Sequence, residues 1–252
     1  MSTALLNTLL DRPNSPVDNL RAVAIRLGFH DCVGGCNGCV NFNNPDNAGL
    51  QPAVDVFTSL YFKNGYNNIV SLADFYALAT TVSIINAVHE SNYQRTGTLT
   101  SPCPVPCFPM QWGRIDSKDC SNDNSILPSP TMTGDAMYAY FAKEFGFTKN
   151  QVVALMGAHS FGSVHPFNSG YNGKWTGQQN KGLSEAFYSL MIDPSVTFTN
   201  INVANGTGPK WEFKADYRDK TNAGFMFNTD FEVFYNLTLN ADGQVTLLYI
   251  NG

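Results

Sequence analysis

The stretch from Gln151 to Gly162 constrains the fold more than any other part of the chain. Its apolar residues recur at helical spacing, at positions 152, 153, 155, 156 and 161, which predicts a helix with one buried face. His159 lies late in this helix, after Gly157 and Ala158, whose small size leaves room for a flat, bulky group beside the backbone. A neutral imidazole in an apolar pocket is a common metal ligand. For one histidine alone, a hydrogen-bonded core residue is the simpler interpretation, so the rest of the chain must decide.

Length and composition limit the classes of protein to consider. The chain has 252 residues, enough for one large domain or two small ones, and 43% of them are hydrophobic. Its formal net charge of −5 argues against a nucleic acid partner. We expect no membrane span, because no apolar run reaches the length of about 18 residues that a spanning helix needs.

The cysteines indicate an oxidising environment. Their even number predicts two or three disulfides. They are Cys32, Cys36, Cys39, Cys103, Cys107 and Cys120. Zinc bound by the 32–39 run is the less favoured alternative, because no Cys/His pair with finger spacing follows it. The glycosylation sequons at Asn205 and Asn236 also point to secretion, so we expect an extracellular protein.

A helix over residues 16–30 carries a second group of candidate residues. Pro16 and Asp18 fit the start of a helix. Arg26 and His30 are four residues apart and therefore share one face. A cation beside an imidazole can combine charge stabilisation with acid–base catalysis. The alternative is an exposed polar stripe, which the apolar neighbours of the pair make less plausible.

The remaining pattern is mainly helical with long loops. The helix of His159 starts at Thr148, a predicted N-cap. Further helices are predicted over 4–10, 70–85, 133–145, 183–192 and 228–235, and strands within 196–214 and 244–250. Residues 96–131 are rich in proline and predict a loop.

Six blocks, in this order, make the chain resemble the haem peroxidase superfamily of plants, fungi and bacteria. They are Arg26–Asp31, Asn47–Leu50, Val70–Asp74, Gly113–Asp116, Leu155–Gly162 and Asn228–Asp230. The resemblance implies a mainly α, two-domain helical fold with haem b between the domains and a few short strands. The implied domains are 1–146, with Arg26 and His30, and 147–252, with His159.

The resemblance also implies the roles of the matching residues. His159 would bind the haem iron, and Asp230 would accept the imidazole N–H. His30 would take a proton from hydrogen peroxide and return it to the leaving oxygen. Arg26 would stabilise the charge that develops, and Asn47 would orient His30.

The segment after His159 is most similar to the intracellular class of the superfamily, which comprises cytochrome c peroxidase and ascorbate peroxidase. Trp175 matches a tryptophan that lies against the proximal histidine, and His165 matches a residue that contacts a haem propionate. Hydrogen-bonded to Asp230, Trp175 could carry a radical; a packing wall is an equally good interpretation. Phe29 departs from this class, which has tryptophan on the distal side.

Other departures bear on substrates and cations. Asn168 replaces the arginine that ascorbate peroxidases use, and Val23 and Asn19 replace the carboxylates of manganese-oxidising enzymes. Neither substrate is therefore supported. Two cation sites, for calcium or potassium, keep only part of their ligands. The matching residues are Asp31 and Asn37 on the distal side and Ser160 and Thr176 on the proximal side.

The sequence thus predicts a haem peroxidase that oxidises small aromatic, chiefly phenolic, donors with hydrogen peroxide. One alternative is a cytochrome c peroxidase-like enzyme that accepts electrons from a protein donor through Trp175. The other is a non-catalytic haem-binding protein on the same scaffold.

Overall fold

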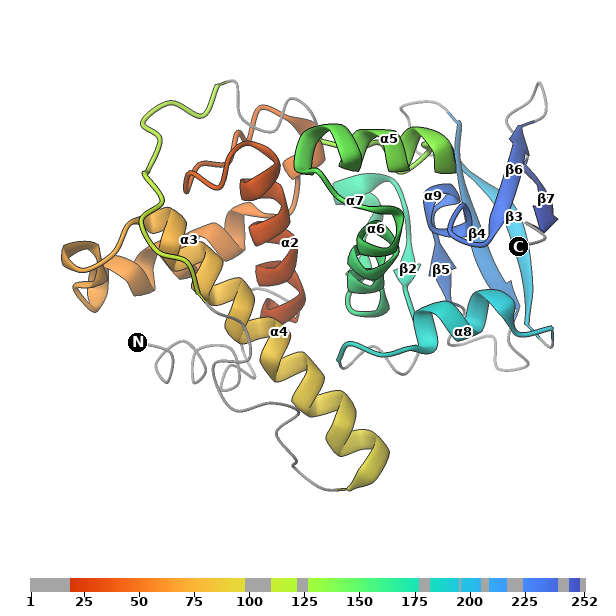
Figure 1. Cartoon of the computed structure of the whole chain (residues 1–252), viewed down its shortest axis with the longest axis horizontal. Helices are drawn as coiled ribbons and strands as arrows, with labels where there is room; N and C mark the ends of the chain where they lie inside the picture. The colour runs from red at the N-terminus through yellow and green to blue at the C-terminus, as the bar shows by residue number, and fades with distance from the viewer. Residues whose placement is uncertain are drawn as a thin grey trace. The chain divides into compact units, whose positions relative to one another are not determined.

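The computed structural model describes residues 19–97, 110–121, 127–176, 182–194, 196–204, 209–216, 224–239 and 245–249. The predicted helix over 4–10 lies outside these residues, as do Cys103 and Cys107. The chain divides into two compact units, residues 1–127 and 128–252. The first is helical, and the second combines helices with short strands (Figure 1). The prediction of a mainly α fold with a few strands is confirmed. No described helix has both the length and the apolar character needed to cross a membrane.

The described part of the first unit is built from three α-helices and two 3-10 turns. They are α2 (Leu20–Val33), η1 (Pro45–Asn47), α3 (Gln51–Lys63), η2 (Tyr66–Asn68) and α4 (Leu72–Thr96). α2 begins later than predicted, because Asn19 caps it by accepting a hydrogen bond from the Ala22 amide. α3 was not predicted. Its buried residues Ala53, Phe57 and Tyr61 follow one another at intervals of four, as one helix face requires.

Helices α2 and α4 approach each other closely at Gly28. The Thr80 hydroxyl of α4 donates a hydrogen bond of 3.0 Å to the Ala24 carbonyl of α2. A Cβ atom added to Gly28 would lie only 2.1 Å from the Thr80 Oγ1. Gly28 stands between Arg26 and His30 in the sequence, so the glycine lets α4 support the helix turn that carries both residues.

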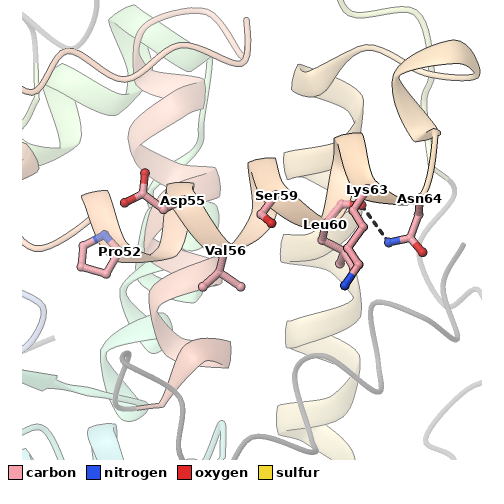
Figure 2. Close-up of a pocket in the computed structure, with 7 residues that line it drawn as sticks. All are labelled: Pro52, Asp55, Val56, Ser59, Leu60, Lys63 and Asn64. Atoms are coloured by element: carbon pink, nitrogen blue, oxygen red, sulfur yellow. Dashed lines mark hydrogen bonds between the residues drawn. The ribbon is translucent and has the colours of Figure 1, made fainter.

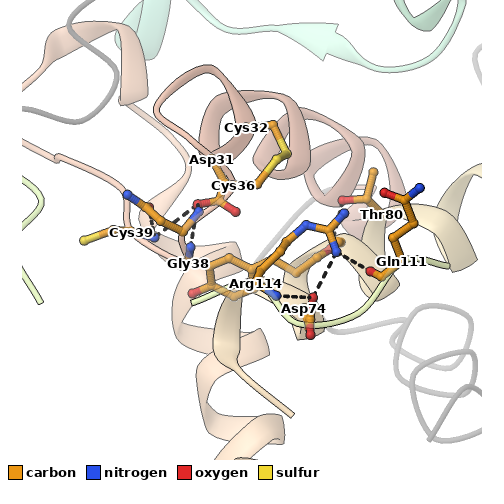
Figure 3. Close-up of a disulfide and its surroundings, with 12 residues drawn as sticks. Asp31, Cys32, Cys36, Gly38, Cys39, Asp74, Thr80, Gln111 and Arg114 are labelled. Carbon is orange, nitrogen blue, oxygen red and sulfur yellow. Dashed lines mark hydrogen bonds and ion pairs between the residues drawn. A yellow bond between two sulfur atoms is a disulfide. The ribbon is translucent and has the colours of Figure 1, made fainter. Parts of the chain in front are cut away.

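The segment around Gly113 is tied to the start of α4 by two carboxylates (Figure 3). Asp74 of α4 accepts a hydrogen bond of 2.7 Å from the Gly113 amide and an ion pair of 2.9 Å from Arg114. In return, Asp116 accepts hydrogen bonds of 2.9 Å from the amides of Leu72 and Ala73. Each segment thus accepts hydrogen bonds from backbone amides of the other. The cap that Asp116 provides was not predicted.

The four cysteines among the described residues form two disulfides. Cys32 pairs with Cys36 at the end of α2 (Figure 3), and Cys39 pairs with Cys120. Disulfides were predicted, and these two leave no thiolate in the 32–39 run for zinc. The second closes a loop of 81 residues, and a loop of that length stabilises the folded chain by about 4 kcal/mol in the chain-entropy model.

In the described part of the second unit, the longer antiparallel strands lie together on one side of a group of helices (Figure 1). Its helices are α5 (Gly134–Phe145), α6 (Lys149–Met156), η3 (Gly157–Ser160), α7 (Pro166–Ser169), α8 (Ala186–Ile192) and α9 (Asn228–Phe231). Its strands are β1 (Ser163–Val164), β2 (Gly173–Lys174), β3 (Thr197–Ala204), β4 (Pro209–Asp216), β5 (Phe225–Met226), β6 (Tyr235–Leu239) and β7 (Val245–Tyr249). They pair as β1-β2, β3-β4-β5 and β6-β7. The helix predicted over 228–235 is too long, because α9 ends at Phe231, residues 232–234 form a turn and β6 starts at Tyr235.

The helix of His159 differs from its prediction at its end. Thr148 and Gln151 form the capping box that starts α6. The α-helix stops at Met156, and a 3-10 turn, η3, carries His159. The sequence prediction also divided the chain at 146, whereas the structure divides it at 127, so α5 belongs to the second unit. The stacked rings of Phe141 in α5 and Phe147 before α6, 6.4 Å apart, account for this difference.

Replacing Gly28 by alanine tests the contact between α2 and α4. An ordinary glycine-to-alanine change inside a helix stabilises it by about 1 kcal/mol. Here we expect Gly28→Ala to lower the free energy of unfolding by about 1–3 kcal/mol, because the new methyl group overlaps Thr80. Urea denaturation followed by circular dichroism measures the difference.

A Thr80→Ala substitution provides the control. It removes the atom nearest to the added methyl group, so the loss in the double variant should be smaller than the sum of the two single losses. A Gly28→Ala protein that is more stable than the wild type would show that the helices do not need the glycine.

Candidate active site

His30 is held by a hydrogen bond from its ring to a buried amide. The side chain of His30 is 9% exposed, and its Nδ1 lies 2.7 Å from the Oδ1 of Asn47, which is fully buried. Asn47 is oriented in turn, because its Nδ2 donates a hydrogen bond of 2.8 Å to the Asn41 carbonyl. The amide oxygen must therefore face His30. Since an amide oxygen can only accept, Nδ1 of His30 carries the proton.

Arg26 determines that the other ring nitrogen of His30, Nε2, is unprotonated. Its Nε lies 3.3 Å from the Nε2 of His30 and can only donate a hydrogen bond. The neutral tautomer with the lone pair on Nε2 satisfies both contacts. Burial lowers the pKa of His30, the charge of Arg26 lowers it further, and the hydrogen bond to Asn47 opposes them, which leaves the pKa at about 3. His30 is thus a neutral base at neutral pH.

Arg26 is a half-buried cation that donates hydrogen bonds to backbone carbonyls of the loop at η1. Its Nη1 donates to the Ala48 carbonyl at 3.0 Å and its Nη2 to the Asp46 carbonyl at 2.8 Å. Burial lowers the pKa of Arg26 to about 10, and the charge of Asp46 opposes the shift. The guanidinium therefore keeps its charge at neutral pH. The structure brings together Arg26, His30 and Asn47, the three residues that the sequence marked as catalytic.

The second candidate histidine has the same arrangement with a charged acceptor. The Nδ1 of His159 lies 2.8 Å from the Oδ1 of Asp230, a residue with no exposed surface. The other oxygen of Asp230 accepts a hydrogen bond of 2.7 Å from the Phe227 amide. The carboxylate is thus oriented by the start of its own helix, α9.

These contacts leave His159 suited to bind a metal through Nε2. Its side chain is 35% exposed, and no described residue forms a hydrogen bond with its Nε2. A histidine ligand that donates its other N–H to a carboxylate has a fixed tautomer and a more basic ligand atom. The donor set therefore fits the iron of haem b. No group of three or more His, Cys, Asp or Glu side chains that could hold a metal ion occurs among the described residues.

Trp175 forms one wall of the group of aromatic residues at His159. Its ring is stacked on the imidazole, with centroids 4.1 Å apart and planes at 4°. Phe225 and Phe227 contact it at centroid distances of 4.7 and 5.0 Å. The hydrogen bond expected between Trp175 and Asp230 is not among the contacts of the described residues, in which the carboxylate accepts hydrogen bonds from His159 and from the Phe227 amide.

The other two candidate haem contacts are Phe29, which precedes His30, and His165, which follows His159 by six residues. Phe29 meets His30 edge to face, with centroids 5.9 Å apart. His165 precedes α7 and stacks on the exposed ring of Phe167, and its Nε2 lies 3.4 Å from the Ser163 hydroxyl. Both side chains are partly exposed, so they remain candidates for contact with a bound group.

The residues proposed for cations have other partners in the structure. The Oδ1 of the buried Asp31 accepts hydrogen bonds from the amides of Asn37, Gly38 and Cys39, at 2.8 to 3.2 Å (Figure 3). Three N–H groups converging on one oxygen disfavour a cation there, so Asp31 acts as a cap for this loop. Thr176 donates a hydrogen bond of 2.9 Å to the Ser160 carbonyl, so this pair is brought together as expected.

Two contributors to the site were missed by the sequence prediction. They are the Asn41 carbonyl behind Asn47 and the Phe227 amide behind Asp230. Both act through the backbone, so residue types carry no direct signal for them. The turn-forming run from Asn41 to Asp46 and the position of Asp230 three residues after Phe227 are the only hints, since such runs and spacings favour capping.

A hollow on the outer face of α3 has no link to these residues (Figure 2). Among the described residues it is lined by Pro52, Asp55, Val56, Ser59, Leu60, Lys63 and Asn64. None of them is a predicted site residue. The Asn64 side chain is hydrogen-bonded to the Leu60 carbonyl at 2.9 Å, which closes the end of the helix.

Comparison with known proteins gives a consistent result. Residues 7–242 match the peroxidase family model. The chain is 26% identical to a Debaryomyces hansenii protein named "Putative heme-binding peroxidase", over 90% of this chain and 50% of that protein. It is 29% identical to "L-ascorbate peroxidase 5, peroxisomal" of Arabidopsis thaliana, over 69% and 58%. It is 28% identical to "Cytochrome c peroxidase, mitochondrial" of Candida albicans, over 73% and 42%. The chain thus spans about half the length of these curated relatives.

The low pKa of His30 predicts a pH dependence of stability. In the unfolded chain the pKa of a histidine is about 6.5, and in the folded chain that of His30 is about 3. Between these values the unfolded chain binds a proton that the folded chain does not. The stabilisation from the neutral state is therefore complete above about pH 6.5. It should fall by up to about 1.4 kcal/mol per pH unit as the pH drops toward 3.

His30→Gln removes the titrating group and should reduce this slope. Urea denaturation at pH 7, 6, 5 and 4 compares the variant with the wild type. Equal slopes for the two proteins would show that His30 titrates normally in the folded chain.

Proposed function

Since the chain belongs to the peroxidase family, we propose that it is a haem b peroxidase that reduces hydrogen peroxide to water and oxidises small aromatic donors. The observation that carries the proposal is the arrangement of Arg26, His30 and Asn47, which places a neutral base beside a half-buried cation. A protein that only stored haem would not need this pair. The names of the relatives support haem as the cofactor.

Bound haem would supply the iron and the electrons for the two-electron reduction of the peroxide bond. His159 would hold the group through Nε2, while Asp230 keeps the imidazole in the required tautomer. Phe29, His165 and Trp175 are proposed as further contacts with it.

His30 would act as the proton carrier. The lone pair on Nε2 takes a proton from one oxygen of hydrogen peroxide, and the proton then passes to the leaving oxygen, which departs as water. Asn47 holds the Nδ1–H throughout, so the ring cannot turn or change its tautomer. Arg26 stabilises the negative charge on the leaving oxygen from a half-buried position, where such an interaction is stronger than in water.

Reaction of the haem-loaded protein with peroxide tests this proposal. Wild-type protein should oxidise a simple phenol such as guaiacol with repeated turnover. His30→Leu should react with peroxide at least about 100-fold more slowly, because a positioned base contributes about 10²- to 10⁴-fold. Stopped-flow absorption of the haem band measures the first step directly.

The control is His89→Gln, a histidine change in the same unit that leaves the proposed site intact. Peroxide reactivity in His30→Leu equal to the wild type would exclude the assigned role. Haem binding without turnover in the wild type would favour the haem-binding alternative. Faster oxidation of reduced cytochrome c than of phenol, lost in Trp175→Phe, would favour the protein-donor alternative.

We also propose that the protein works in an oxidising, extracellular environment. The disulfides Cys32–Cys36 and Cys39–Cys120 support this location. Asn236 and Thr238 of the second sequon are both exposed on β6, as an accepted glycan requires, whereas the Asn205 sequon lies outside the described residues.

Secretion from a eukaryotic host tests this proposal. We expect a mass shift that glycosidase treatment removes and that Asn236→Gln reduces. The variant should keep its haem content, since Asn236 lies on a strand apart from the proposed site residues. Recovery only of unglycosylated protein with free thiols would contradict an extracellular location.

A further inference from the structure

Tyr188 of α8 lies where α6 gives way to η3. In a continuous α-helix, the Gly157 amide would donate to the Val153 carbonyl, four residues earlier. Here the Gly157 amide is directed to the carbonyls of Ala154 and Leu155, as the tighter turn requires. The Tyr188 hydroxyl donates a hydrogen bond to the Val153 carbonyl instead. The phenol thus provides a donor for the carbonyl that the change of helix type leaves without one.

The same hydroxyl also lies against Gly157. Burial raises the pKa of the Tyr188 phenol, and a hydrogen bond from the Gly157 amide opposes the rise. A Cβ atom on Gly157 would lie 2.8 Å from the phenol oxygen and 3.5 Å from two ring carbons. The φ angle of −58° is normal for any residue, so it is space that requires glycine here. The room beside Gly157 that the sequence suggested for a flat, bulky group is therefore occupied by Tyr188.

The next residue toward the N-terminus of α8 supports the other end of the turn. The ring of Phe187 is fully buried and meets the His159 imidazole edge to face, with centroids 6.3 Å apart. Two consecutive residues of α8 therefore contact the start and the histidine of η3. Helix type matters for His159, because a 3-10 turn advances by about 120° per residue and an α-helix by about 100°. Over the two residues from Gly157 this difference turns a side chain by about 40°.

We propose that Tyr188 is a positioning residue for His159: its hydroxyl, inserted between Val153 and Gly157, holds η3 in the 3-10 form that aims the imidazole at Asp230. Without the hydroxyl, the Gly157 amide can return to the Val153 carbonyl, and the turn relaxes toward an α-helix. His159 then loses its alignment with the buried carboxylate. The consequence for an iron ligand rests on the proposed function, whereas the effect on the turn does not.

Tyr188→Phe tests the inference, because it removes the hydroxyl and keeps the ring. Hydrogen exchange of the full-length protein, with and without haem, reports on the turn itself. We expect the amides of residues 157–160 to exchange about 10-fold faster, the factor that corresponds to one lost hydrogen bond. In the haem-loaded ferrous protein, resonance Raman should show a shifted and broadened iron–histidine stretching band.

Tyr61→Phe is the matched control. It removes a hydroxyl that donates to the Val70 carbonyl at 2.7 Å in the first unit and keeps the ring. It should lower the melting temperature to a similar extent and leave exchange at 157–160 and the Raman band unchanged.

A second variant, Gly157→Ala, displaces the phenol from the opposite side and should give the same local signature. Unchanged exchange at 157–160 in Tyr188→Phe would overturn the proposal, as would an equal change in Tyr61→Phe. A protein that bound no haem would contradict the proposed function, yet the exchange measurement would still decide the role of Tyr188.

Discussion

A hydrogen bond from Nδ1 to a buried oxygen controls both candidate histidines. In each case the acceptor has no exposed surface, and in each case the bond fixes the tautomer that leaves Nε2 with its lone pair. The acceptors differ in charge. Asn47 is neutral, and its hydrogen bond only partly opposes the burial and the Arg26 charge that lower the pKa of His30, so the ring stays unprotonated. Asp230 is a carboxylate, so the Nε2 of His159 becomes a stronger electron donor, as an iron ligand should be. The same type of hydrogen bond, with a neutral acceptor in one case and a charged acceptor in the other, thus suits one histidine to act as a base and the other to bind a metal.

Each acceptor is in turn oriented by a backbone group, which links the chemistry to local folding. The Asn41 carbonyl turns the Asn47 amide, and the Phe227 amide holds the Asp230 carboxylate. Backbone groups have few rotational states, so they orient a side chain with little loss of entropy. The close packing of α2 on α4 at Gly28 also helps to position the site, because it keeps the helix that carries Arg26 and His30 from shifting.

Features that depend on neighbours in the sequence could be predicted, and those that depend on distant partners could not. The four-residue spacing of Arg26 and His30, the Thr148 cap and the end of α5 at Gly146 are local and appear as expected. The change from α6 to η3 was missed because its cause, Tyr188, lies more than 30 residues away along the chain. The cap that Asp31 forms was missed because a carboxylate before a glycine-rich loop fits a cation site equally well by sequence. The roles of His159 and Asp230 followed from resemblance, since residue types alone favoured a core histidine.

Trp175 packs against His159, and among the described contacts its indole makes no hydrogen bond to Asp230. A tryptophan that gives up an electron becomes a strong N–H acid, and a carboxylate hydrogen-bonded to the indole nitrogen would stabilise that state. The Asp230 carboxylate is engaged instead by His159 and by the Phe227 amide. What the indole does provide is a flat surface parallel to the imidazole, closed on its other sides by Phe225 and Phe227. Such a wall blocks rotation of His159 about its side-chain bonds. The hydrogen bond to Asp230 fixes the position of Nδ1, and Tyr188 holds the turn that aims the imidazole at Asp230. The ring is then restrained by three independent contacts, and only its Nε2 edge remains available to a bound group.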